Sequence, residues 1–67
     1  MTLELISKTI YEIWTEGKKV GYCEKGRGSA RTHEWRAAIY GKPIWAVNEN
    51  VYLAAGEAIR EYYGVEA

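Results

Sequence analysis

The sequence predicts an α+β domain, in which an antiparallel meander of three to four strands carries one C-terminal amphipathic helix on one face. Two segments alternate apolar and polar residues on either side of short turns, as strands of a hairpin do. Near residue 50 the apolar period changes from two residues to the helical spacing. A chain of 67 residues has room for one small core, so we treat residues 1–67 as a single domain.

The first hairpin is predicted in the segment TIYEIWTEGKKVGYCEK, where Glu16-Gly17 has the chemistry of a tight two-residue turn. This turn pairs Ile13 with Val20, and the period of two then separates the side chains of the hairpin into two sets. The set assigned to the core is Tyr11, Ile13, Val20 and Tyr22. The opposite set is Ile10, Glu12, Trp14, Lys19 and Cys23.

The second hairpin is predicted in EWRAAIYGKPIWAV, with Gly41-Lys42 as a type II′ turn and a following strand from Ile44 to Val47. Pairing of Ile39 with Ile44 places the core side chains on one face and leaves the others opposite. The core set is Trp35, Ala37, Ile39, Ile44 and Ala46, and the opposite set is Arg36, Tyr40, Trp45 and Val47. Between the hairpins, residues 26–32 (GRGSART) are rich in turn formers and predict a basic flexible loop.

The helix is predicted over roughly residues 50–63, with Asn48 or Asn50 as its cap and Gly64 as its C-terminal stop. Its apolar stripe is expected to pack on the sheet. The stripe consists of Val51, Ala55, Ala58, Ile59 and Tyr62. Residues 1–7 are left open as an N-terminal extension, an extra edge segment or a partner-binding strand. The side chains expected between sheet and helix are Ile13, Val20, Trp35, Ile39, Ile44, Val51 and Ile59.

Charge is segregated along a chain whose net charge is zero. Residues 18–42 hold seven Lys and Arg against two Glu, a net charge of +5, whereas residues 1–17 carry −2 and residues 43–67 carry −3. One helix covers one sheet face, so the opposite face is open to a ligand. Cations neutralise phosphates and aromatic rings stack on bases, which together favour nucleic-acid binding. The expected positive surface consists of Arg27, Arg31 and Arg36, supported by Lys19 and Lys25. Tyr40 is a further candidate for nucleic-acid binding, and Trp14 and Trp45 are candidate stacking or protein-binding residues.

The stretch WRAAIYGK, Trp35 to Lys42, followed by Ile44-Trp45 and by Glu57-Ala58, resembles the sheet-plus-helix DNA-binding domains of phage integrase N-termini and plant ethylene-responsive factors. The resemblance covers about half of the chain. It implies that the sheet face opposite the helix contacts DNA in the major groove, through residues that correspond to Lys19, Arg36 and Tyr40.

Catalysis and metal binding are not expected. The chain contains no Asp, one His (His33) and one Cys (Cys23), and these have no ligand spacing or orienting acid. A single cysteine and the absence of a signal or membrane segment predict a cytoplasmic protein without a cofactor. The expected function is that of a small phage-like accessory or regulatory protein that binds nucleic acid. The alternative is a protein-binding module or small inhibitor that uses the aromatic open face, with a homodimer among its forms.

Overall fold

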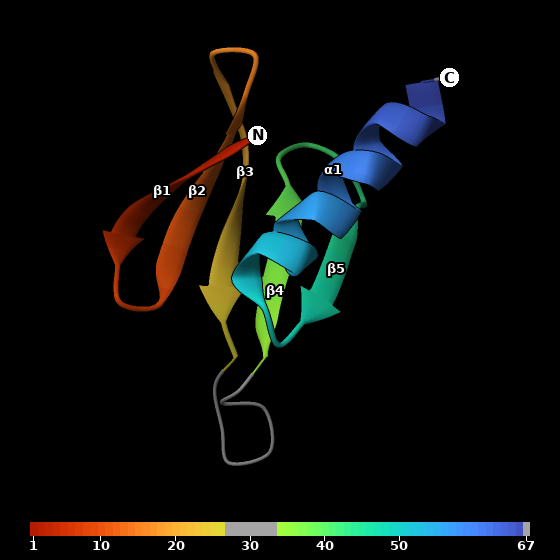
Figure 1. Ribbon diagram of the computed structural model, residues 1–67. Helices are drawn as coiled ribbons and strands as arrows, with labels where there is room; N and C mark the ends of the chain where they lie inside the picture. Colours follow the sequence, from red (N-terminus) through yellow and green to blue (C-terminus); the bar gives the residue numbers. More distant parts are fainter. Residues whose placement is uncertain (27–33, 67) are drawn as a thin grey trace.

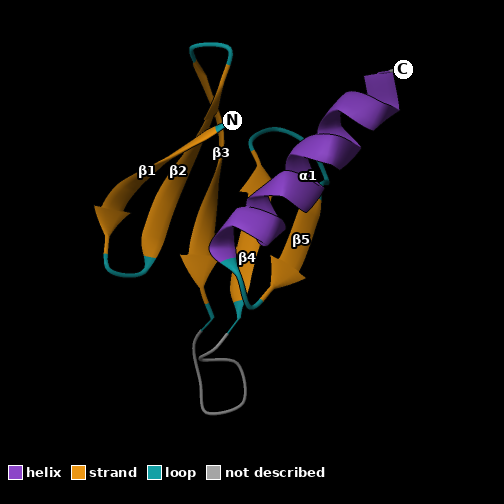
Figure 2. Cartoon of the chain, viewed as in Figure 1, coloured by secondary structure: helices purple, strands orange, loops and turns teal. Residues whose placement is uncertain are grey.

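The fold is a five-stranded antiparallel sheet with one helix on one face, seen in a computed structural model that describes residues 1–26 and 34–66 (Figures 1 and 2). The strands follow the chain order: β1 (Thr2–Ser7), β2 (Ile10–Thr15), β3 (Lys18–Lys25), β4 (Trp35–Ile39) and β5 (Trp45–Asn48). The helix α1 (Val51–Glu66) lies across β4 and β5 and reaches β3. The α+β class is confirmed, and the predicted strand count of three to four is too low.

The additional strand is β1, which pairs with β2 at the edge of the sheet. Among the three alternatives left open for residues 1–7, the structure shows an edge strand. The connection at Lys8-Thr9 contains no Gly, Pro, Asn or Asp, so nothing in its composition marks a turn. The register of β1 also shifts between Leu5 and Ser7, which interrupts the alternation that would identify a strand.

The β2–β3 hairpin turns where predicted, because Glu16 and Gly17 both have positive φ (53° and 76°), as a type I′ turn requires. The predicted register holds only as far as Trp14 opposite Lys19. A bulge follows, so that Ile13 pairs with Gly21 in place of Val20.

The bulge exchanges the faces of the rest of β3. Tyr22, predicted in the core, points away from the helix, and Cys23, predicted on the open side, is fully buried. Gly21 explains why the bulge occurs here: a Cβ on this residue would lie 2.1 Å from the carbonyl oxygen of Ala38 in β4. Only glycine permits this approach of the two strands.

The β4–β5 register is confirmed, with Ala37 opposite Ala46 and the Ile39 N–H donating to the Ile44 carbonyl at 3.1 Å. The predicted type II′ turn is wrong. The turn is closed by the Lys42 N–H donating to the Ile39 carbonyl at 3.3 Å, so Gly41, at φ 71°, occupies the third position. A third-position glycine with positive φ is typical of a type II turn.

Helix α1 begins at the predicted cap and ends later than predicted. The Asn50 side-chain oxygen accepts from the N–H groups of Tyr52 (2.9 Å) and Leu53 (3.2 Å), which satisfies two donors of the first turn. Gly64 is not the stop, since the helix continues through Glu66. A glycine ends a helix only when it adopts the left-handed conformation, and Gly64 does not have a positive φ.

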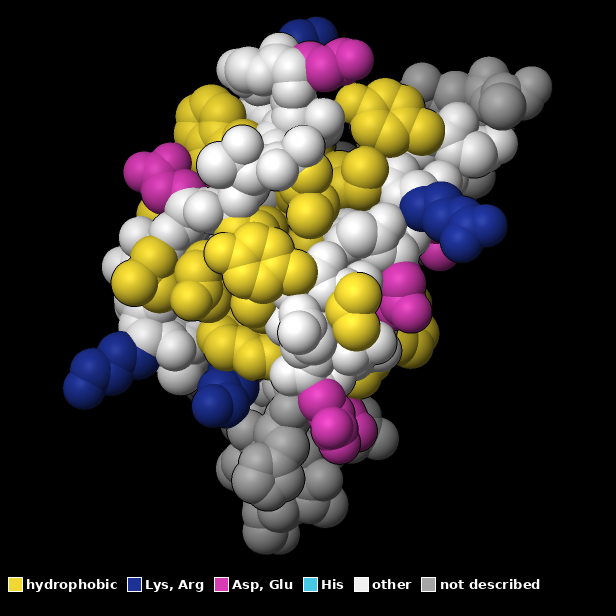
Figure 3. Space-filling view, viewed as in Figure 1, with side chains coloured by type: hydrophobic (Ala, Val, Ile, Leu, Met, Phe, Trp, Pro, Cys, Tyr) yellow, Lys and Arg dark blue, Asp and Glu magenta, His cyan; other side chains and the backbone are white. Residues whose placement is uncertain are grey.

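The core lies between α1 and the β3–β5 part of the sheet. Three helical alanines let the helix approach closely, and the buried set is Ile13, Cys23, Ala37, Ile39, Ile44, Ala54, Ala55 and Ala58. Of the predicted core, Ile13, Ile39 and Ile44 are buried, whereas Val20, Trp35, Val51 and Ile59 are half-buried and pack at its margin. Figure 3 looks onto this side, where hydrophobic side chains gather centrally and Lys and Arg lie at the periphery.

Candidate functional site

The sheet face away from α1, called the open face here, is uncovered across all five strands in the described part of the chain. Alternation along the strands assigns to it the cations Lys19 and Arg36 and three carboxylates. These carboxylates are Glu4, Glu12 and Glu24. As predicted, Trp14, Arg36, Tyr40, Trp45 and Val47 lie on this face.

The aromatic residues of the open face, apart from Trp14 on β2, gather on its β3–β5 half. Tyr22, Ala38 and Trp45 are direct neighbours across three strands, and Trp45 is 63% exposed. The rings of Tyr22 and Tyr40 are 5.8 Å apart and tilted by 31°. Tyr22, Ala38 and Trp45 border a hollow of about 330 Å³, called the aromatic hollow. It is lined by Tyr22, Arg36, Ala38, Lys42, Pro43, Ile44, Trp45 and Val47.

A second hollow, of about 240 Å³, lies at the end of the sheet that carries the β2–β3 and β4–β5 turns, and helix α1 contributes Tyr62 to its lining. Three lysines converge here beside two tyrosines, and it is called the lysine hollow. Its lining residues are Lys18, Lys19, Val20, Ile39, Tyr40, Lys42 and Tyr62. Because Lys42 borders both hollows, positive charge continues from Arg36 to the end of the sheet.

The predicted single positive surface is not what the structure shows for its described members. Lys19 and Lys25 lie at opposite ends of β3, about 20 Å apart for an extended strand of this length. Lys25 also lies on the helix side, with its Nζ 5.8 Å from the centre of the Trp35 ring. Arg36 lies on the open face, so Lys25 and Arg36 project from opposite sides of the sheet. Arg27, Arg31 and the loop 26–32, apart from Gly26, lie outside the described residues, as does His33.

Lys19 is tied to the acidic half of the open face. Its Nζ is 3.1 Å from a carboxylate oxygen of Glu12. This is the one ion pair within the described ranges, residues 1–26 and 34–66. The hydrogen bond and the charge of Glu12 raise the pKa of Lys19 above its ordinary value. Part of the charge of Lys19 is therefore already balanced within the protein.

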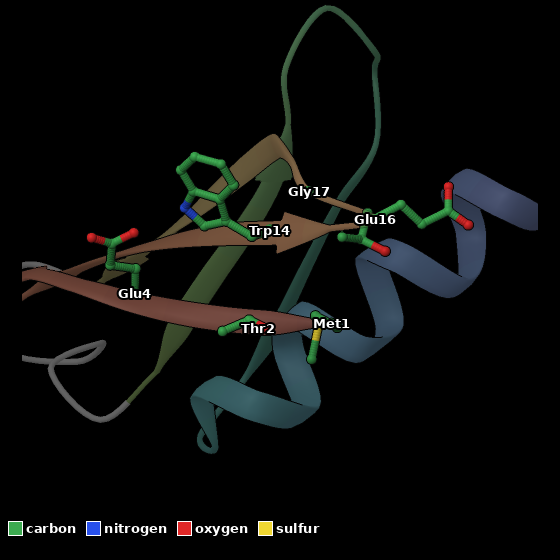
Figure 4. Close-up of a pocket in the computed structure, with 7 residues that line it drawn as sticks. Met1, Thr2, Glu4, Trp14, Glu16 and Gly17 are labelled. Carbon is green, nitrogen blue, oxygen red and sulfur yellow. The ribbon is translucent and has the colours of Figure 1, made fainter.

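The β1–β2 half of the open face has its own hollow, of about 360 Å³, shown in Figure 4. Trp14 stands between Glu4 and Glu16 there, with Thr2 and Met1 along the neighbouring strand. The indole Nε1 of Trp14 is buried without a hydrogen-bond partner in the described structure. Two carboxylates beside a half-buried ring disfavour a phosphate at this position.

Nucleophilic chemistry at Cys23 is disfavoured by its surroundings. The side chain is fully buried, and this burial raises the pKa of the thiol to about 11, so that it stays protonated at neutral pH. No group of three His, Cys, Asp or Glu side chains within the described ranges is arranged to hold a metal ion.

Sequence reasoning missed three residues of the two hollows. Lys18 and Lys42 belong to the basic segment but sit in or beside turns, where strand parity does not assign a face. Tyr22 was placed in the core because the bulge at Val20 was not recognised. The pair Val20-Gly21 was the available signal, because a glycine inside a strand often marks a bulge.

Searches against protein-family models, curated proteins and solved structures find no match to this chain. No helix in the described part is long and apolar enough to cross a membrane.

Proposed function

We propose that this protein binds nucleic acid without catalysis, through the aromatic hollow and the adjoining lysine hollow. The observation that supports this most is the convergence of Arg36 and Lys42 with the rings of Tyr22 and Trp45 around one concave site. Cations recruit phosphates, and exposed rings provide surfaces on which bases stack. The resemblance to the sheet-plus-helix DNA-binding domains supports the same face, since Arg36, Tyr40 and Lys19 all lie on the side opposite the helix.

The charge of the open face limits the footprint. Carboxylates of Glu4 and Glu12 lie on β1 and β2, and that of Glu24 lies on β3 opposite Arg36. The described cations available to phosphate lie on β4, at the start of β3 and in the β4–β5 turn. A nucleic acid therefore contacts one half of the face, and binding is weak and dependent on salt. This fits a small accessory or regulatory protein of the phage type better than a high-affinity repressor. The single cysteine favours a cytoplasmic setting.

Fluorescence anisotropy with labelled single-stranded and duplex DNA and RNA over a salt series tests the proposal. The double variant Arg36→Gln/Lys42→Gln should flatten the slope of log affinity against log salt by about one to two units. Arg60→Gln is the matched control, because Arg60 is an exposed arginine on α1. Absence of salt-dependent binding to every probe at low ionic strength would refute the proposal.

Protein binding is the second candidate, and the exposed apolar residues of the open face favour it. Trp45 and Val47 are exposed on the edge strand β5. The strands of the open face carry three carboxylates and two cations, so their charges do not favour a polyanion. Aromatic residues of this kind often anchor protein interfaces, including homodimers. Sedimentation equilibrium of the wild type and of Trp45→Ala tests it. Concentration-dependent dimerisation that is insensitive to salt and lost in the variant would support this candidate.

A further inference from the structure

The aromatic hollow has the form of a slot for one flat ring, an inference that rests on the proposed function and specifies its ligand. Tyr22 on β3, Ala38 on β4 and Trp45 on β5 lie directly opposite one another. The central residue has only a methyl group, whereas both neighbours are large and aromatic. The floor of the hollow is therefore low and two of its walls are rings.

The spacing of the walls suits a ring inserted between them. Neighbouring strands are about 4.8 Å apart, which places β3 and β5 about 10 Å from each other. Stacked or tilted aromatic rings have centroids about 4.5–7 Å apart, so a ring between two others needs about 9–14 Å. The volume of about 330 Å³ lies at the lower end for ligand pockets, which suits a single nucleotide unit.

The rim of the slot supplies positive charge at two places. Arg36 precedes Ala38 by two residues on the same face of β4, and Lys42 lies in the turn beyond the other end of that strand. Glu24 lies opposite Arg36 on β3, but neither Arg36 nor Lys42 forms an ion pair with a carboxylate in the described parts of the chain. A base in the slot would thus have a cation near the phosphate on each side of it.

The slot is held in place before any ligand arrives. The Tyr22 ring packs against Tyr40 at 5.8 Å, and the Tyr40 N–H donates to the Val20 carbonyl at 2.9 Å. The close approach of Gly21 to Ala38 fixes β3 against β4 directly beneath. Such support reduces the entropy that the side chains of the slot lose when a ligand binds.

We propose that the aromatic hollow binds one unstacked base of a single-stranded nucleic acid, sandwiched between Tyr22 and Trp45 above Ala38, with its flanking phosphates at Arg36 and Lys42. A duplex keeps its bases stacked inside the helix and cannot present one to the slot without unstacking it. The site therefore selects single strands over duplexes.

A short labelled oligothymidine and a labelled hairpin duplex are the probes, compared by anisotropy at low salt. The wild type should bind the single strand at least about tenfold more tightly than the duplex. Ala38→Leu fills the slot without changing charge, and Trp45→Ala removes a wall. Each should weaken single-strand binding by about 5- to 160-fold, the range expected for stacking of one base. Trp45→Phe keeps a ring and should restore most of the affinity.

The outcomes separate the slot from the broader proposal. Circular dichroism and a thermal melt first establish that Ala38→Leu is folded; if it is not, Trp45→Ala and Trp45→Phe, at an exposed position, decide the question alone. Salt-dependent binding that favours the duplex, or that survives Ala38→Leu and Trp45→Ala, overturns the slot and leaves the proposed function standing. Absence of binding to both probes overturns the proposed function, and the slot with it.

Discussion

The two halves of the open face use similar residues to opposite effect. On the β1–β2 half, Trp14 is half-buried between carboxylates, and Glu12 forms an ion pair with Lys19 of the neighbouring strand β3. On the β3–β5 half, Trp45 is exposed, and Arg36 forms no ion pair within the described residues although Glu24 of β3 lies opposite it. Residue type alone would have given both halves the same role. What distinguishes them is which neighbour the register places beside each ring and each cation.

The largest effect is expected within the β3–β5 half, where Gly21 of β3 lies against the Ala38 carbonyl of β4. Gly21→Ala would place its Cβ 2.1 Å from that oxygen, and neither backbone can move without breaking the β3–β4 pairing. We expect a loss of about 3 kcal/mol or more in the free energy of unfolding, a large part of the stability of a small domain. Chemical denaturation followed by circular dichroism measures it.

The matched control is Gly56→Ala on α1, where no atom lies within 4 Å of the added Cβ. This variant should gain about 0.5–1 kcal/mol, because alanine loses less backbone entropy in a helix. If Gly21→Ala were as stable as the wild type, the bulge would not require glycine, and the assignment of Tyr22 to the open face would lose its physical basis.

The β4–β5 hairpin shows how much of the fold the sequence predicts. Its alternation of side chains between the two sheet faces extends over Trp35 to Ile39 without interruption. The sheet face on which Arg36, Trp45 and Val47 lie therefore follows from the period of two alone. The β2–β3 hairpin follows the same rule only to Trp14, since one extra residue inverts every side chain beyond it. Register errors of one residue leave the fold class correct and the site wrong.

The candidate site was predictable only in part for the same reason. Arg36, Tyr40 and Trp45 were assigned correctly from strand parity. The grouping of Lys19 with Lys25 followed from closeness in the sequence, and an extended strand separates them by its whole length. Lys18 at the start of β3 and Lys42 in the β4–β5 turn come together only in the folded sheet, and no local pattern predicts this.

Substitution of the two tryptophans provides a comparison of intermediate size. Trp14→Phe removes an indole N–H that is buried without a partner, and such a group costs about 1–3 kcal/mol when it loses water. This relief should offset the smaller ring, so the free energy of unfolding should stay the same or rise by up to about 1 kcal/mol. Trp45→Phe, at an exposed position, should change it by less than about 0.5 kcal/mol. Urea denaturation compares both variants with the wild type, and a loss above about 1 kcal/mol for Trp14→Phe would indicate that its N–H has an acceptor.

The smallest effect is expected for Glu12→Gln, which tests whether the acidic half restrains the basic one. Lys19 lines the lysine hollow but bonds to Glu12 at 3.1 Å on an exposed surface, where water screens the pair and its contribution to stability is slight. Glu12 raises the pKa of Lys19, so whatever stability the pair contributes is present below the unfolded pKa and is lost as pH rises through the folded one. The variant should therefore lower the pKa of Lys19 toward its ordinary value, which an NMR titration of the lysine side chains measures, with Glu57→Gln on α1 as the control.

Without its ion pair to Glu12, Lys19 becomes available to a phosphate, and the salt slope of nucleic-acid binding should steepen by up to about one unit. An unchanged pKa would contradict the ion pair itself, whereas a lowered pKa with an unchanged slope would place Lys19 outside the interface and confine nucleic-acid contact to the β4–β5 side.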